Sequence, residues 1–154
     1  MKKELAKELI EFINESPTAY HGAHTVKSML DNVGYKEVKE SEKWNLTSGG
    51  KYYFMKNGSA IIAFQIGSEE IENGGFKLIG AHTDSPTFKI KPNAEMKVEN
   101  KYVKLNTEVY GSPILSTWFD RPLSVAGKIV VREGNKFVSK LVNIDRDLVI
   151  IPNL

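Results

Sequence analysis

The chain has 154 residues, enough for one ordinary domain or for parts of two, and its 41% hydrophobic and 26% charged residues are typical of a globular protein. Its 21 basic and 19 acidic residues leave a net charge of +2, which is too balanced for a nucleic-acid-binding protein. No apolar run approaches the roughly 20 residues that cross a bilayer, and the N-terminus lacks the apolar stretch of a signal peptide. Cysteine is absent, which excludes disulfides and thiolate metal sites, and we expect a cytoplasmic protein with no membrane partner.

The first part of the chain predicts two helices. Apolar residues recur at helical spacing over residues 3–14, and Ser16-Pro17-Thr18 ends that helix. A second amphipathic helix is predicted over residues 21–33, and Gly34 follows as its C-terminal stop.

Strand-forming runs follow these helices. Residues 51–56 and 59–66 flank Asn57-Gly58, which is the strongest hairpin signal in the chain. The second run is apolar on both faces and predicts a central strand that is covered on both sides. Residues 76–81 predict another short buried strand, which leads directly to His82. Two helices followed by such strands indicate an α/β fold.

The pattern changes after Phe88, where helical periodicity ends. Residues 96–110 and 125–151 predict strands, with turns at 99–101 and 133–136. The basic stretch over residues 89–104 is interleaved with acidic and apolar residues, so we interpret it as a solvated strand face. We place a domain boundary within residues 88–95, which gives an N-terminal α/β part over 1–90 and a β-rich part over 91–154. The apolar run that ends at Leu154 suggests a cut through a longer protein.

His82 and Asp84 are the candidate site residues. In open α/β sheets, sites form beyond the carboxyl ends of the strands, where a neutral imidazole can bind zinc. An aspartate two residues later can orient that imidazole, and Pro86 restricts the backbone beside it. The spacing alone also fits a surface histidine followed by an aspartate that begins a turn.

Longer motifs surround this pair. Three of them are Ala81-His82-Thr83-Asp84-Ser85-Pro86, Tyr110-Gly111 and the block Ser116-Thr117-Trp118-Phe119-Asp120-Arg121-Pro122-Leu123-Ser124-Val125-Ala126-Gly127-Lys128. Together with Ser16-Pro17-Thr18-Ala19-Tyr20-His21 and Gly50-Lys51-Tyr52-Tyr53, they closely resemble the aspartyl aminopeptidase / aminopeptidase I family of zinc metallopeptidases, and all of them follow one another along the chain in the order expected of that family. The resemblance spans essentially the whole chain.

This resemblance implies a zinc-dependent aminopeptidase that hydrolyses N-terminal residues from peptides, with two zinc ions in a complete site. It assigns metal binding to His82 and a supporting role to Asp84. It also implies an α/β/α catalytic domain, represented by residues 1–90, that is interrupted by a mostly β dimerisation domain beginning at residue 91, and a homo-oligomeric assembly. The remaining metal ligands and the general base would lie beyond Leu154, so we expect residues 1–154 to be inactive alone.

One departure, one residue pair and one partial motif bear on this interpretation. Pro122 stands where the family block carries an acidic residue, which weakens any expectation of acidic substrates. Asp120 and Arg121 are interpreted as a structural pair beside an aromatic anchor. Residues 151–154 match the start of a motif whose later histidine, in the family, reaches the active site of a neighbouring subunit.

Other interpretations stay open at this point. His21 and His24 have an i, i+3 spacing that could bind a metal, although a helix start and a surface position explain them better. Ser85, Ser112 and Ser116 have no partner base at a recognisable spacing, which disfavours a serine hydrolase. A non-catalytic oligomerisation fragment is the first alternative function, and a glycosidase with paired carboxylates is the second.

Overall fold

A computed structural model describes residues 2–153 as two compact units. The first unit takes the chain up to Asp84 together with Ala126–Ile144, and the second takes Ser85–Val125 with the chain from Asp145 onward. The hairpin residues 126–144 therefore group with the N-terminal unit, whereas the sequence places them in the β-rich part. The division at residue 90 into catalytic and dimerisation domains stays a prediction.

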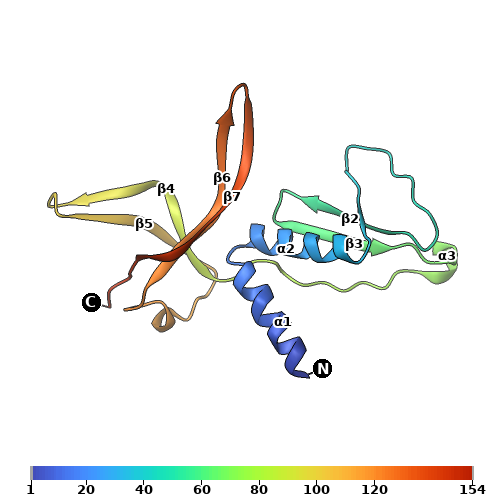
Figure 1. Cartoon of the computed structure of the whole chain (residues 1–154), viewed down its shortest axis with the longest axis horizontal. Helices are drawn as coiled ribbons and strands as arrows, with labels where there is room; N and C mark the ends of the chain where they lie inside the picture. The colour runs from blue at the N-terminus through green and yellow to red at the C-terminus, as the bar shows by residue number, and fades with distance from the viewer. Residues whose placement is uncertain (1, 154) are drawn as a thin grey trace. The chain divides into compact units, whose positions relative to one another are not determined.

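Two helices open the first unit, as the periodicity predicts (Figure 1). Helix α1 spans Lys2–Glu15 and helix α2 spans Ala19–Asn32. Thr18 caps α2 from an extended conformation, and its side chain accepts a hydrogen bond from the backbone N–H of His21. At the other end, Gly34 has a φ of 83°, and the N–H groups of Gly34 and Tyr35 donate to the carbonyls of Asp31 and Leu30. This is a Schellman ending, which confirms Gly34 as the helix stop.

The first unit contains a three-stranded sheet in the order β1–β2–β3. Strand β1 (Lys36–Glu37) runs parallel to β2 (Lys51–Lys56), and β2 pairs antiparallel with β3 (Ala60–Gln65). The turn residues Asn57 and Gly58 have φ values of 54° and 73°, which is the signature of the tight hairpin turn that the sequence predicts. The parallel pairing of β1 was not predicted, because two residues carry no periodicity.

The two faces of this sheet pack differently. Tyr53 is fully buried, and so is Ala23 on α2. On the opposite face, the ring centroid of Trp44 lies 5.4 Å from that of Phe54 and 5.7 Å from that of Phe64. Aromatic packing on one face and burial of Tyr53 on the other form the core of this unit.

Two strand predictions are wrong in their burial. Strand β3 lies at the edge of the described sheet, and its Ile62 is 52% exposed. Residues 76–81 form no strand, and Leu78 and Ile79 are 90% and 102% exposed. An apolar pattern indicates that a segment is suited to burial, but it does not show what covers the segment. The described residues supply no partner strand for residues 76–81.

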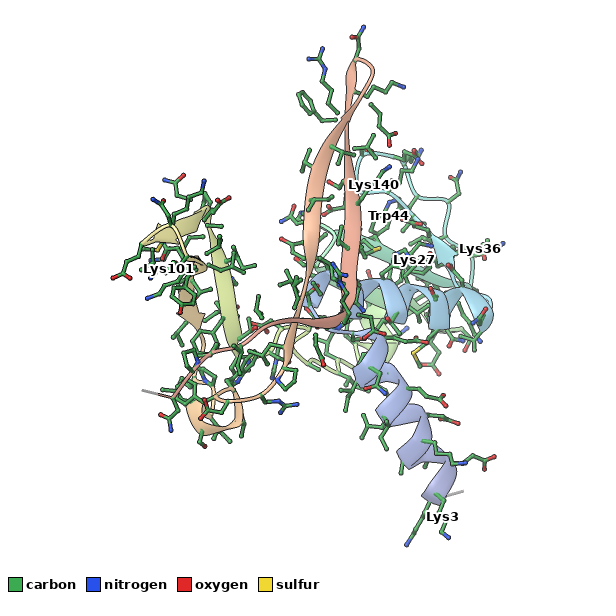
Figure 2. All side chains as sticks on the ribbon, turned by 60° about the vertical axis from the view of Figure 1, so that its left-hand side comes forward. Lys3, Lys27, Lys36, Trp44, Lys101 and Lys140 are labelled. Carbon is green, nitrogen blue, oxygen red and sulfur yellow. The ribbon has the colours of Figure 1, made fainter. Side chains whose placement is uncertain are left out.

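The rest of the chain is rich in hairpins. Strand β4 (Thr87–Val98) pairs antiparallel with β5 (Tyr102–Tyr110), and β6 (Leu123–Glu133) pairs with β7 (Lys136–Val149). The turns fall where the sequence predicts them, and Figure 2 shows Lys101 at the tip of the β4–β5 hairpin. Strand β4 begins well before residue 96, and its register shifts between Ile90 and Glu95. Pro92 lies within this irregularity, where a missing N–H costs no ladder hydrogen bond.

Two short elements complete the described chain, the single-turn helix α3 (Ile71–Gly74) and the 3-10 turn η1 (Leu115–Thr117). No helix in residues 2–153 is long and apolar enough to cross a membrane. Mixed helices and sheets confirm the α/β class.

Candidate metal site

The segment that carries His82 and Asp84 is tied to the first unit through the residue between them. The Thr83 hydroxyl donates a hydrogen bond of 2.7 Å to the carbonyl of Ser59, directly after the Asn57-Gly58 turn. Gly22 in the first turn of α2 lies close to the Thr83 carbonyl, because a Cβ added at Gly22 would come within 3.7 Å of that oxygen. The hairpin turn therefore holds the backbone between the two candidate residues, and α2 lies beside it.

His82 and Asp84 are brought together by this backbone. His82 Nδ1 donates to the backbone carbonyl oxygen of Asp84 at 2.8 Å, and the same nitrogen lies 3.2 Å from the Asp84 carboxylate oxygen Oδ1. A carbonyl oxygen only accepts hydrogen bonds, so the proton sits on Nδ1 in this arrangement. In a neutral imidazole with this tautomer, the second ring nitrogen, Nε2, presents a lone pair, which is the form in which histidine binds a metal ion.

Exposure distinguishes the two side chains. The side chain of His82 is 82% exposed and that of Asp84 is 45% exposed. The imidazole is therefore oriented by Asp84 on one side and open on the other. An arrangement of this kind suits a metal ligand that is supported by an aspartate. The same exposed imidazole is also accessible to water.

The donor set fits zinc at one position. Structural and catalytic zinc sites take three or four nitrogen, oxygen or sulfur ligands. Nε2 of His82 is a suitable nitrogen, but residues 2–153 contain no group of three or more histidines, aspartates or glutamates placed to hold a metal ion. This part of the chain can thus supply a ligand and its support, and it does not complete a metal centre.

The other two histidines lie elsewhere in the first unit, on α2. The hydroxyl of Thr18 lies 2.8 Å from Nδ1 of His21, and burial together with the nearby His24 lowers the pKa of His21. Both histidines line an open cavity of about 610 Å³ with residues of the β6–β7 hairpin, where the Lys128 ammonium lies 4.3 Å from the ring centroid of Tyr20. A lowered pKa favours neutral imidazole, but no group of three or more histidines, aspartates or glutamates that could hold a metal ion lies around these histidines in the described chain.

Asp120 and Arg121 contact different partners within the second unit. The Asp120 carboxylate accepts a hydrogen bond of 2.9 Å from the N–H of Asn153, and the Asp120 N–H donates to the carbonyl of Ile151. Arg121 donates instead to the carbonyl of Thr117, so the two side chains do not form the predicted pair. Asp120 therefore fastens the segment 151–153, of whose motif Leu154 lies outside the described residues. The aromatic anchor is confirmed, because the ring centroid of Trp118 lies 5.3 Å from that of Phe88.

A polar network under α2 was missed by sequence reasoning. The Tyr53 hydroxyl donates to the Asp31 carboxylate at 2.7 Å and accepts from the Lys27 ammonium at 2.7 Å, and Lys27 also pairs with Asp31 at 2.8 Å (Figure 2 labels Lys27). Hydrogen bonds from Lys27 and then Tyr53 lower the pKa of Asp31. Lys27 and Asp31 show an i, i+4 pair in the sequence, but Tyr53 is 22 residues or more from both, and nothing in the pattern signals it.

Known proteins resemble this chain in both sequence and fold. The family model described as aminopeptidase I zinc metalloprotease (M18) matches residues 12–154. A protein of Clostridium novyi named "Probable M18 family aminopeptidase 2" is 56% identical over 155 residues, which cover 99% of this chain and 36% of that protein. A protein of the same name from Ectopseudomonas mendocina is 40% identical over 154 residues, covering 100% of this chain and 36% of its own length.

Solved structures agree with these matches. Chaetomium thermophilum mApe1 superposes with a TM-score of 0.92 at 32% identity, over 100% of this chain and 36% of that one. A yeast mApe1, solved as a dodecamer, gives a TM-score of 0.90 at 30% identity, over 99% of this chain and 36% of that one. The present chain thus spans about a third of the length of the relatives that it matches, and it belongs to the M18 family of aminopeptidases, which are peptide hydrolases.

Proposed function

We propose that this chain is the N-terminal part of a zinc-dependent aminopeptidase that removes N-terminal residues from peptides. The observation that carries the proposal is the geometry of His82, whose Nδ1 is held by Asp84 while Nε2 is left open for a metal ion. The family match supports the reaction class.

Each side chain has a separate task in this proposal. His82 is one zinc ligand, and Asp84 fixes the tautomer and the direction of its ring. Thr83 acts through the backbone, because its hydrogen bond to Ser59 holds the segment in place. The chemistry that two bound zinc ions would supply is activation of a water molecule and polarisation of the scissile carbonyl. The other ligands and the general base belong to polypeptide outside the present 154 residues.

Three further properties belong to the same proposal. Peptides are the substrates, and the whole protein forms a homo-oligomer, which is supported by the dodecamer of the yeast relative. We also propose a cytoplasmic location, and a catalytic part over residues 1–90 that is followed by part of a dimerisation domain over 91–154. The 154 residues alone are inactive, since one histidine and one supporting carboxylate cannot assemble a dinuclear site.

A chimaera provides the test. These 154 residues replace the matching 36% of the Clostridium novyi relative, and hydrolysis of aminoacyl p-nitroanilides is measured with and without a chelator. Chelation abolishes activity, His82→Ala lowers it by about 100-fold or more, and Asp84→Asn lowers it by about 10-fold to 100-fold. His24→Ala is the matched control, because His24 is exposed on α2 and has no role in the proposed site. Chelator-insensitive hydrolysis, or full activity of His82→Ala, would refute the proposal.

The non-catalytic alternative predicts a different result. An oligomerisation fragment would give a defined oligomer by light scattering from the 154 residues alone, and the chimaera would hydrolyse no peptide. The same measurements on one pair of samples therefore separate the two functions.

A further inference from the structure

An open cavity of about 610 Å³ lies within the first unit. Its walls come from the first two turns of α2, from the end of β2 with the turn that follows it, and from the β6–β7 hairpin. A volume of this size falls within the roughly 300–1,000 Å³ of small-molecule sites. His82 and Asp84 do not line the cavity, so the proposed zinc site does not account for it.

Tyr20 joins these walls. Its ring centroid lies 4.3 Å from the ammonium nitrogen of Lys128, which is a cation–π contact. A Cβ added at Gly58 would come within 3.9 Å of the Tyr20 ring carbon Cδ1, so the turn after β2 also packs beside this ring. The ring of Tyr20 therefore holds a lysine ammonium at the cavity, in a place where an acidic side chain would be its usual neighbour.

The hairpin brings a positive charge and two polar side chains to the cavity without a matching anion. Within the described part of the chain, Lys128 forms no ion pair with a carboxylate, and the side chains of Ser139 and Asn143 form no hydrogen bond. No aspartate or glutamate stands among the described residues that line the cavity. Because Ser139 and Asn143 lie four residues apart on β7, their side chains point to the same face of the strand. A bound anion would satisfy all three groups.

His21 adds a further donor. The Thr18 hydroxyl accepts a hydrogen bond from the backbone N–H of His21, and it lies 2.8 Å from Nδ1 of the ring. Burial and then the nearby His24 lower the pKa of His21, so the neutral ring predominates near neutral pH. When Nδ1 accepts the Thr18 hydroxyl proton, a neutral ring carries its own proton on Nε2. His21 is then suited to a ligand that accepts hydrogen bonds.

Apolar side chains form the rest of the wall. Met55 and Leu141 line the cavity together with the ring of Tyr20. Leu141 stands between Ser139 and Asn143 on the same face of β7. An inorganic ion would leave this apolar surface in water. The lining therefore matches a molecule that has both an anionic group and an apolar part.

From this lining we infer that the cavity binds a small organic anion. The carboxylate or phosphate group of the ligand pairs with Lys128 and accepts hydrogen bonds from Ser139 and Asn143. Its apolar part lies against Tyr20 and Leu141. The inference goes beyond the proposed function and does not rest on it, because these residues take no part in the proposed zinc site.

Matched probes test the inference in the chimaera with the Clostridium novyi relative. Binding of phenyl phosphate, of phenylacetate and of the uncharged phenylethanol is measured by saturation-transfer nuclear magnetic resonance. We expect saturable binding of at least one anion with a dissociation constant of about 1 mM or below, and binding of phenylethanol that is at least about 10-fold weaker. The anion that binds more tightly identifies the acidic group that the site takes.

Substitutions locate the binding. Lys128→Gln weakens the binding of the anions by about 10-fold and leaves that of phenylethanol unchanged. Ser139→Ala weakens the binding of the anions by about 3-fold, and it decides the question if Lys128→Gln does not fold. Lys140→Gln is the matched control, because Lys140 lies on the same hairpin (Figure 2), pairs with Glu133 at 2.6 Å and does not line the cavity. Its affinity for the anions equals that of the wild type.

Three results overturn the inference. The first is the absence of saturable binding of either anion up to about 10 mM. The second is equal affinity for phenylethanol and for the anions, and the third is unchanged affinity for the anions in a folded Lys128→Gln variant. Peptide hydrolysis is measured separately on the same chimaera, so the proposed function and the anion site can fail independently of each other.

Discussion

Tyr53 on β2 is completely buried, and Ile79 in the apolar stretch 76–81 is completely exposed. The sequences around them are similar in strand propensity. The difference is that β2 has β3 on one side and β1 on the other, and its Tyr53 bonds with Lys27 and Asp31 of α2, whereas residues 76–81 have no partner strand among the described residues. The comparison shows that propensity selects an extended backbone, and that burial depends on which elements the chain itself contains.

The largest expected effect separates these two positions. Tyr53→Ala removes a buried ring and its hydrogen bonds with Lys27 and Asp31, and it lowers the stability of the first unit by about 3–5 kcal/mol. Ile79→Ala changes stability by less than about 0.5 kcal/mol in the same chain, because Ile79 is completely exposed. Amide exchange of β2 and β3 in the 154-residue chain measures both. Equal costs at the two positions would remove the basis of the comparison.

A second prediction concerns the C-terminal end of α2, which belongs to the packed region. Residues 76–81 contain no such local stop signal. Gly34→Ala places a Cβ on a residue with a φ of 83° and costs about 1–2 kcal/mol. Gly127→Ala is the control, because an added Cβ there meets nothing within 4 Å. Its effect is near zero or slightly stabilising. Exchange of the α2 amides reports the difference, and a tolerated Gly34→Ala would mean that the helix ending carries no strain.

A third prediction extends the comparison to residues 151–153, which do have a partner within the chain. Asp120→Ala removes the acceptor for the Asn153 N–H and places alanine at a φ of 52°, so the local cost is about 0.5–1.5 kcal/mol. Asp120→Asn keeps an acceptor and tolerates this φ. Nuclear magnetic resonance of the Asn153 amide shows faster exchange in the alanine variant only. Unchanged exchange in both variants would contradict the fastening role.

The smallest effect is the acid sensitivity of the packed region. Hydrogen bonds from Lys27 and Tyr53 hold the pKa of Asp31 below its ordinary value of 3.8. A depressed folded-state pKa gives stability that is present above the unfolded pKa and is lost as the pH falls through the folded one. The thermal stability of the chimaera therefore falls as the pH drops below about 4. In the Asp31→Asn variant, stability falls less steeply with pH over the same range. If stability falls equally steeply with pH in the wild-type chimaera and in the Asp31→Asn variant, the ionisation of Asp31 does not contribute to the acid sensitivity.

The sequence predicts the local elements well and the burial of the strands less well. Helical spacing identifies α1 and α2, Gly34 identifies a helix end, and Asn57-Gly58 identifies a hairpin. Each of these depends on neighbours along the chain. The pairing of β1 with β2, the network at Tyr53 and the contact of Asp120 with Asn153 depend on residues far apart in sequence, which no periodicity reports.

The candidate site shows the same division. Spacing places Asp84 within reach of His82, and the structure brings Nδ1 onto the Asp84 carbonyl. The role of Thr83 in holding that segment to Ser59 could not be predicted, because it joins residues 24 positions apart. Metal binding by His82 stays a prediction, since the described residues supply only one corner of a site.

Counting zinc in the chimaera tests the central claim most directly. Metal content is measured by inductively coupled plasma mass spectrometry after dialysis, for the wild-type chimaera and for His82→Ala and His24→Ala variants. We predict two zinc ions per chain in the wild type and in His24→Ala, and a loss of at least one in His82→Ala. Equal zinc content in the wild type and in a folded His82→Ala variant would contradict the assignment of His82 as a ligand.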